Sequence, residues 1–323
     1  MEYKEPDMEI RQLQYFVTLA QEGNYLNAAE TLYVSQSQLS KKIMALEEEL
    51  AVKLIDRSKR KIAVTDEGNI VLEHAQDILV FHEAMLRELG EFKGLAPPVL
   101  DILSIPVLAP YEIPALLSAF RKEEPEIRIQ VTEAEASVIL PALGRKEAEL
   151  GLVRDIFIDQ ELYGFAPVCE DEVVAIIPRN HRLAGRTSIE LADLKGEPFI
   201  MSDKQTLLYN FYLELCRRKG IEPNIVHTSS HTENIVEMVA SGMGVSLMMR
   251  TVVAYQKKIG VCVMPLSESV TCHLGFAWSK DTRLSKSARK FISFIRKTCP
   301  RPACCMNGGS PVSPGVPPLS SLP

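Results

Sequence analysis

The stretch NAAETLYVSQSQLSKKIMALEEELAVKLIDRSKRKIAVTDEG, residues 27–68, decides the fold of the N-terminal part of the chain. In its middle the apolar residues recur at steps of three and four, as at Leu39 and Ile43, which indicates a helix with one inward face. Ser35 followed three places later by Gln38 has the pattern of a capping box, in which the hydroxyl accepts from a backbone N–H. We therefore predict a helix that begins at Ser35, preceded by two shorter helices with the same periodicity.

A basic turn follows this helix. Residues 54–65, LIDRSKRKIAVT, contain two short strand-like pieces on either side of residues 57–61, of which four are Lys or Arg. Such a segment predicts a β-hairpin, or wing. Three helices and a wing make a winged helix-turn-helix, in which the third helix enters the major groove of DNA while the wing lies along the backbone.

The outer face of the third helix supplies the candidate base-reading residues. Gln can pair with an adenine edge, and Lys or Arg with phosphates. The alternative is a solvated polar face on an ordinary three-helix bundle, but the basic run just downstream favours DNA binding. Glu47, Glu48 and Glu49 are expected to face away from DNA or to pair locally. The candidate DNA-binding residues are Ser35, Gln36, Ser37, Ser40, Lys41, Lys42, Arg57, Lys59, Arg60 and Lys61.

A long amphipathic segment comes next, and residues 94–98, GLAPP, end it. Its apolar residues alternate steps of four and three, a mean spacing that is typical of helices that pair with one another. The alternative is a helix that lies on its own domain, which usually has a wider apolar stripe. His82 lies on the same face and is interpreted as a tolerated polar layer. The candidate dimerisation residues are Val71, Ala75, Ile78, Met85, Leu89 and Phe92.

Strand-like and helical segments alternate from residue 99 onward. The order strand, helix, strand, helix, strand occurs once over residues 100–153 and again over residues 199–248, which predicts two α/β lobes with parallel strands. Residues 168–178 are apolar enough for a strand that crosses between the lobes, and residues 261–278 for a strand that returns. Two crossings predict a hinge.

Composition excludes several classes of protein. The net charge of −6 argues against a basic coat for non-specific nucleic-acid binding, although the positive charge is concentrated early in the chain. The first residues have no apolar segment, so we expect neither a signal peptide nor a membrane anchor, and a cytoplasmic location. The sequence has no GxSxG, P-loop or HExxH motif, so we predict neither an enzyme nor a cofactor.

The seven cysteines form no regular framework and lack the paired spacing of a zinc site, so no metal is predicted. In the cytoplasm they are expected to be reduced and structural. A redox-sensing pair, such as Cys262 with Cys272, is the alternative.

The residues from Asn27 to Gly68 resemble the DNA-binding segment of the LysR-type transcriptional regulators. The family's pattern appears as Ala28-Ala29-Glu30, Val34-Ser35-Gln36, Leu39-Ser40, Leu46-Glu47, the basic wing, and Thr65 to Gly68. Where the family often has Pro and Ala after Val-Ser-Gln, this chain has Ser37 and Gln38, so its base preference is expected to be its own. The resemblance covers about residues 8–298.

This resemblance implies a homodimer, often assembled into a tetramer, that binds double-stranded DNA, a small-molecule inducer and RNA polymerase. The inducer is expected between two lobes like those of periplasmic binding proteins, in loops at the carboxyl ends of strands. For Ser137 and Thr232 the alternative role is a helix N-cap, and for His231 it is a surface loop residue. Ile105 and Val107 make one wall apolar, which argues against a simple carboxylate inducer. The candidate effector-binding residues are Ser104, Pro106, Ala136, Ser137, Ser202, Thr228, Ser230, His231 and Thr232.

The predicted fold class is thus α+β and α/β: a winged helix-turn-helix, a long linker helix and a two-lobed domain like a periplasmic binding protein. The predicted boundaries are residues 8–65 for the winged helix, 66–98 for the linker, 99–298 for the effector-binding domain and 299–323 for a disordered tail. Lobe I is expected at 99–166 with 270–298, and lobe II at 167–269. The competing class is an enzyme or a solute-binding protein on the same two lobes, which leaves the N-terminal residues unexplained.

Overall fold

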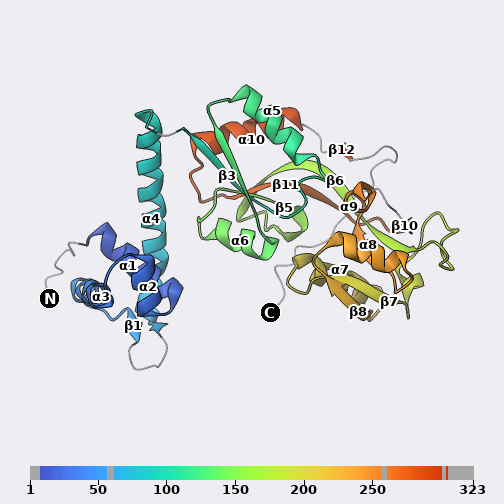
Figure 1. The fold of residues 1–323 in the computed structure, drawn as a ribbon, viewed down its shortest axis with the longest axis horizontal. Coiled ribbons are helices and arrows are strands. Elements are labelled where there is room, and N and C mark those ends of the chain that lie inside the picture. The colour runs from blue at the N-terminus through green and yellow to red at the C-terminus, as the bar shows by residue number, and fades with distance from the viewer. Residues whose placement is uncertain (1–7, 57–61, 96, 257–259, 300–302, 305–323) are drawn as a thin grey trace. The chain divides into compact units, whose positions relative to one another are not determined.

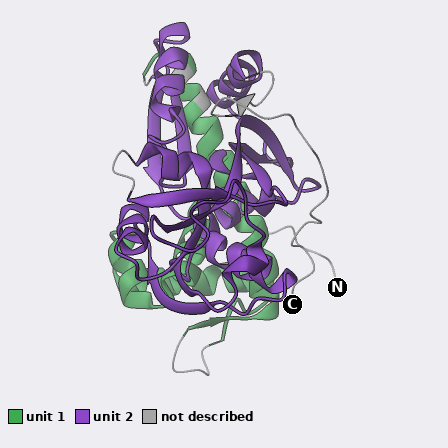
Figure 2. Ribbon diagram, turned by 90° about the vertical axis from the view of Figure 1, so that its right-hand side faces the viewer, with its two compact units in different colours: residues 1–96 green, residues 97–323 purple. Residues whose placement is uncertain are grey.

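The computed structural model describes residues 8–56, 62–95, 97–256, 260–299 and 303–304 (Figure 1). The chain divides into two compact units, residues 1–96 and residues 97–323 (Figure 2). The boundary falls inside the predicted linker of residues 94–98, where Pro and Gly cannot continue a helix.

The first unit begins with the three predicted helices, α1 (Ile10–Glu22), α2 (Tyr25–Thr31) and α3 (Gln36–Leu50). Gly23 ends α1 in the left-handed region at φ +61°, and the Asn24 side chain then caps α2 by accepting from the Leu26 N–H at 2.7 Å. The three inward faces form one core, which includes Phe16, Leu19, Ala28, Leu39, Ile43 and Leu46.

The predicted wing and long helix complete this unit. Strands β1 (Ile55–Asp56) and β2 (Ala63–Val64) pair antiparallel, with Ile55 opposite Val64. The predicted basic turn, residues 57–61, lies outside the described residues. Helix α4 (Asp66–Phe92) follows, and its first half packs on α1.

The second unit contains the two predicted lobes. Lobe I is built from β3 (Val99–Ser104), α5 (Ile113–Glu123), β4 (Arg128–Glu133), α6 (Ala136–Gly144) and β5 (Leu150–Arg154). Strand β3 pairs parallel with both β4 and β5, as the alternating pattern predicts. The C-terminal helix α10 (Lys286–Thr298) packs on this sheet through Phe291, whose ring lies edge-on to Phe120 and Phe276.

Lobe II repeats the order with β7 (Pro198–Ser202), α7 (Leu207–Arg218), β8 (Asn224–Ser229), α8 (Thr232–Ala240), β9 (Ser246–Met249) and α9 (Arg250–Tyr255). Strands β7 and β8 are parallel, whereas β9 pairs antiparallel with the crossing strand β6 (Tyr163–Pro178). Each strand's carboxyl end therefore leads into a helix, as in lobe I.

The crossing strand β6 joins the lobes. Its first part pairs with β11 (Thr271–Ser279), and its last residues pair with β10 (Val261–Pro265). The predicted return strand over residues 261–278 is thus two strands, and the turn between them accompanies the passage from lobe II to lobe I. In Figure 1, β6 and β11 run together through the middle of the unit.

The predicted disordered tail falls mostly outside the described residues. Two of its residues, Ala303 and Cys304, form the short strand β12 parallel to β6, which the sequence analysis did not predict. Among the helices of the described ranges, none combines the length and the apolar character that crossing a bilayer requires.

Candidate DNA-binding and effector-binding sites

Helix α3 separates its inner and outer faces as predicted. Leu39, Ile43 and Leu46 are fully buried. Ser35, Gln36, Ser37 and Lys41 are exposed, while Ser40 and Lys42 are half-buried. The exposed polar residues gather in the first half of the helix, which is the part that reaches base edges in a helix-turn-helix.

Two of these residues have a structural partner. The Ser35 hydroxyl accepts from the Gln38 N–H at 3.2 Å, so it caps α3, and this contact orients the start of the helix. Lys42 forms an ion pair with Glu9 at 3.4 Å across the start of α1. Lys41 on the same turn is more exposed than Lys42, which makes it the better candidate for a phosphate contact.

Glu47 pairs locally, which is one of the two alternatives expected for it, but it is buried rather than solvated. Its side chain is 1 % exposed, and its Oε1 accepts from the Leu54 N–H at 2.9 Å and the Ile55 N–H at 3.2 Å. The spacing in the sequence indicates this burial: Glu47 follows Ile43 by four positions, so it lies on the buried face of the helix. Glu48, one position further, is exposed.

The predicted dimerisation residues of α4 do not all face outward. Ala75 is 1 % exposed in the winged-helix core and is therefore not available to a partner, while Val71 is half-buried against the same core. Ile78, Met85, Leu89 and Phe92 are exposed. Ile70, Phe81 and Leu86 are also exposed and were missed by the strict heptad count.

The predicted effector residues lie where the β-strands of both lobes end. Ser137, at the start of α6, donates to the Gln205 carbonyl oxygen at 3.4 Å, which links a lobe I loop to a lobe II loop. Neither predicted N-cap is one: Glu135 and His231 occupy the cap positions of α6 and α8, without a side-chain capping bond. The hydroxyls of Ser137 and Thr232 are therefore not used as helix caps.

The other predicted effector residues differ in exposure. Ser104 is fully buried, and its hydroxyl donates to the Ile105 carbonyl oxygen at 2.8 Å, so Ser104 supports the loop from within. Ala136 is 6 % exposed. Pro106, Ser230 and His231 are exposed, and Ser202 and Thr228 are half-buried.

Two carboxylates in these loops escaped the sequence analysis. Glu135 precedes α6 and Asp203 follows β7, so they belong to the two loops that the Ser137 contact joins. Burial, and then the negative charge of Asp203, raise the pKa of the Glu135 carboxyl above its ordinary value, and Arg154 opposes this shift. The loops of the two lobes thus bring like charges together.

A buried polar cluster lies where β5 and lobe II meet the crossing strand β6. Arg154, at the end of β5, donates to the Tyr111 hydroxyl at 3.0 Å, and that hydroxyl donates to Asp171 on β6. Burial raises the pKa of the Tyr111 hydroxyl, which keeps it protonated as a donor. The Thr251 N–H of lobe II also donates to Asp171, at 3.1 Å, so the cluster ties both lobes to the crossing strand.

The predicted redox alternative finds little chemical support at Cys272. Its thiol is 4 % exposed, and burial raises its pKa to about 12. A thiol with so high a pKa is protonated at neutral pH and is a poor nucleophile. Across the described residues, moreover, no three His, Cys, Asp or Glu side chains cluster as a metal site requires.

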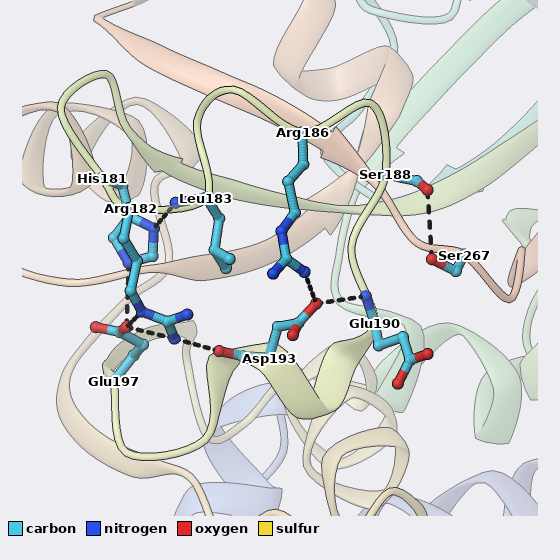
Figure 3. A network of polar contacts seen from close by, with 9 residues as sticks. All are labelled: His181, Arg182, Leu183, Arg186, Ser188, Glu190, Asp193, Glu197 and Ser267. Carbon is cyan, nitrogen blue, oxygen red and sulfur yellow. Dashed lines mark hydrogen bonds and ion pairs between the residues drawn. The ribbon is translucent and has the colours of Figure 1, made fainter.

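The loop between β6 and β7 carries most of the polar network shown in Figure 3, and Ser188 of this loop also bonds to Ser267, which follows β10. Glu197 accepts from His181 and Arg182, and Asp193 pairs with Arg186 at 2.8 Å. His181 Nδ1 accepts from the Leu183 N–H at 3.3 Å, so its proton resides on Nε2, which faces Glu197 at 3.2 Å. These partners lie within one loop and its short 3-10 helix η2 (Leu191–Leu194), and we assign the network a structural role.

Comparison with known proteins gives the same division of the chain. Residues 10–69 match the model described as bacterial regulatory helix-turn-helix protein, lysR family, and residues 94–300 match the LysR substrate binding domain. The chain belongs to the LysR family. It is a DNA-binding transcriptional regulator with an effector-binding domain. The members of this family are transcriptional regulators, which are not enzymes.

Relatives of this LysR-type regulator are similar over nearly their whole length. The uncharacterized HTH-type transcriptional regulator YybE of Bacillus subtilis (strain 168) is 30 % identical over 295 residues, which cover 89 % of this chain and 98 % of that protein. A hydrogen peroxide-inducible genes activator of Dickeya chrysanthemi is 28 % identical, with 80 % and 85 % covered.

Solved structures support the fold. The LysR family regulator HinK of Pseudomonas aeruginosa is 28 % identical with a TM-score of 0.54, covering 90 % of this chain and 98 % of that chain. Full-length CbnR in complex with its target DNA is 21 % identical with a TM-score of 0.61, covering 90 % and 100 %. The predicted fold class is therefore confirmed.

Proposed function

We propose that this LysR-type regulator reads its operator with the exposed first half of α3. The observation that carries the proposal is the capped helix start at Ser35, which presents Gln36, Ser37 and Lys41 together on one exposed face. In the major groove Gln36 has the donor and acceptor that an adenine edge needs, and Lys41 adds a phosphate contact. That a homologous regulator was crystallised with its target DNA supports this proposal.

We propose that two copies pair through the second half of α4. The exposed apolar residues on one side of this part of the helix lie outside the winged-helix core; they are Ile78, Phe81, Met85, Leu89 and Phe92. A homodimer places two copies of α3 on one duplex, so that operator half-sites repeat at the helical period of DNA. We also propose that the dimers assemble into tetramers and contact RNA polymerase in the cytoplasm, because the chain belongs to the LysR family.

The effector binds, we propose, between the loops that follow the strands of lobes I and II. The contact between Ser137 and Gln205 shows how near these loops come, and Ser202, Thr228 and His231 lie in the corresponding loops of lobe II. Closure of the lobes on a small molecule would change how the domains pack and, through α4, the spacing of the DNA-binding pairs. The carboxylates Glu135 and Asp203 favour an effector with a positively charged group.

The Gln36→Ala variant tests the role of α3. We expect it to cost about 1 to 3 kcal/mol on the duplex that the protein prefers from a random-sequence pool, and little on an unrelated duplex. The matched control is Gln38→Ala on the same helix, about half a turn away, which should change neither affinity much. Fluorescence anisotropy measures both affinities. Equal losses on the two duplexes would show that Gln36 reads no base.

Neutralising the paired carboxylates tests the electrostatics of the effector site. Because the pKa of Glu135 is raised, its ionised form destabilises the fold above the ordinary pKa, and this cost disappears as pH falls through the raised value. Glu135→Gln should therefore raise the melting temperature at pH 7, and the gain should vanish in acid. Asp203→Asn should act similarly, and the double variant should gain less than the sum. Glu133→Gln, on exposed β4, is the control; an equal effect there would refute the pairing.

A further inference from the structure

Glu47 connects the DNA-reading helix to the base of the wing. The last turn of α3 carries this carboxylate, and its Oε1 accepts two backbone N–H groups, those of Leu54 and Ile55, where the wing begins. Its other oxygen, Oε2, faces the Lys53 ammonium at 3.4 Å. The Lys53 side chain is 71 % exposed, so this cation is held on one side by Glu47 and remains accessible on the other.

The same short segment is also fixed to the start of α4. Leu54 uses both of its backbone polar groups: its N–H donates to Glu47, and its carbonyl oxygen accepts from the Thr65 N–H at 3.0 Å. The Thr65 hydroxyl donates to the Lys53 carbonyl oxygen and accepts from the Gly68 N–H at 2.9 Å. One cluster therefore joins the end of α3, both ends of the hairpin and the first turn of α4.

A buried carboxylate is costly unless its oxygens are satisfied; here the Leu54 and Ile55 N–H groups satisfy Oε1, and the Lys53 ammonium faces Oε2. Removing Glu47 leaves two buried N–H groups without an acceptor, so the base of the wing must move to find water. The segment between Asp56 and Ile62 carries the basic run of the sequence, and Lys53 lies just before it. Any movement of the base changes where the Lys53 ammonium lies relative to α3.

We propose that Glu47 is a positioning residue for DNA binding, which orients Lys53 at the base of the wing so that its ammonium meets a phosphate while α3 lies in the major groove. The inference rests on the proposed role of α3. Although Glu47 is an acidic residue in a DNA-binding unit, its removal weakens binding to DNA. Simple electrostatics predicts the opposite sign, because loss of a negative charge near a polyanion strengthens binding.

The experiment compares Glu47→Gln with Glu48→Gln in the full-length protein, on one duplex over a range of salt concentrations. Both variants lose one negative charge from the same turn of α3, but only Glu47 contacts the wing. In Glu47→Gln, the amide oxygen can still accept from the backbone while the amide nitrogen faces the Lys53 ammonium and repels it. We expect affinity to fall by about 3- to 10-fold and the salt slope to lose about one unit, as on loss of one phosphate contact.

Glu48→Gln should bind as tightly as the wild type or more tightly, with the same slope. Glu47→Ala, which also removes the backbone acceptor, should lose more affinity and slope than Glu47→Gln. A partly unfolded sample lowers the active concentration but leaves the slope unchanged, so the slope separates positioning from stability. If Glu47→Gln bound like Glu48→Gln, the role of Glu47 would be overturned; if the wild type bound no duplex, the proposed function itself would fail.

Discussion

Replacing Gly68 with alanine should destabilise the winged-helix unit by about 1 to 3 kcal/mol, the cost of overpacking a closed site. A Cβ at this position would lie 2.4 Å from the Leu54 carbonyl oxygen and 2.7 Å from a methyl carbon of Val64. The Leu54 carbonyl is backbone that already accepts from the Thr65 N–H, so it cannot yield without breaking the base of the wing. We therefore expect a lower unfolding temperature and weaker DNA binding together.

Gly90→Ala is the matched control for this prediction. Gly90 lies on the same helix α4, and a Cβ there would meet no atom within 4 Å. Because alanine is the better helix former, this variant should be neutral or more stable by up to about 1 kcal/mol. Calorimetry measures the melting temperature of each variant. If Gly68→Ala melted at the same temperature as Gly90→Ala, the close packing of α4 on the wing would be contradicted.

The double variant Met85→Asp with Leu89→Asp should convert the proposed dimer into monomers. The two side chains are 51 % and 46 % exposed in the single chain, and dimerisation would bury them twice, once from each copy. Full burial of an apolar side chain is worth about 1.5 to 3 kcal/mol, so four half-exposed side chains contribute about 3 to 6 kcal/mol, and their loss weakens Kd at least about a hundredfold. Sedimentation velocity at micromolar concentration measures the change.

The control for this variant adds the same charge to another face of α4. Asn69→Asp with Gln76→Asp introduces two carboxylates at positions that helical periodicity places away from Met85 and Leu89. This protein should remain dimeric and melt at a similar temperature. A dimer that survives the Met85 and Leu89 changes would show that the copies meet through a different surface.

Local patterns predicted most of the fold. Helices α1 to α4 and the alternating strands of both lobes follow from apolar spacing and from caps such as Ser35, because neighbours along the chain decide these elements. The apolar pattern failed to predict elements whose extent is set by pairing with a distant segment of the chain. Residues 261–278 were read as one strand, yet they form two: the polar run Ser267-Glu268-Ser269 separates β10 from β11, and β6 pairs with each of them at a different part of its length.

The candidate sites were predicted less completely, for the same reason. The heptad count located the apolar stripe of α4. It could not tell which residues of the stripe pack into the winged-helix core, so Ala75 was assigned to the dimer surface although it is buried in that core. Local pairing was one expectation for Glu47, but its partners could not be named because they are backbone groups of the next element, those of Leu54 and Ile55. Glu135 and Asp203 lie in loops of different lobes, and only the folded chain brings their charges together.

Sequencing the fragments of its own genome that the purified protein retains, over a range of ionic strengths, tests most directly whether the exposed face of α3 reads duplex DNA. The account predicts a small set of fragments that survive at higher salt and share paired half-sites, about 34 to 36 Å apart or a multiple of that spacing. It also predicts that the Gln36→Ala protein retains a different or less defined set. Retention of no fragments at low ionic strength, or of all fragments alike, would contradict the account.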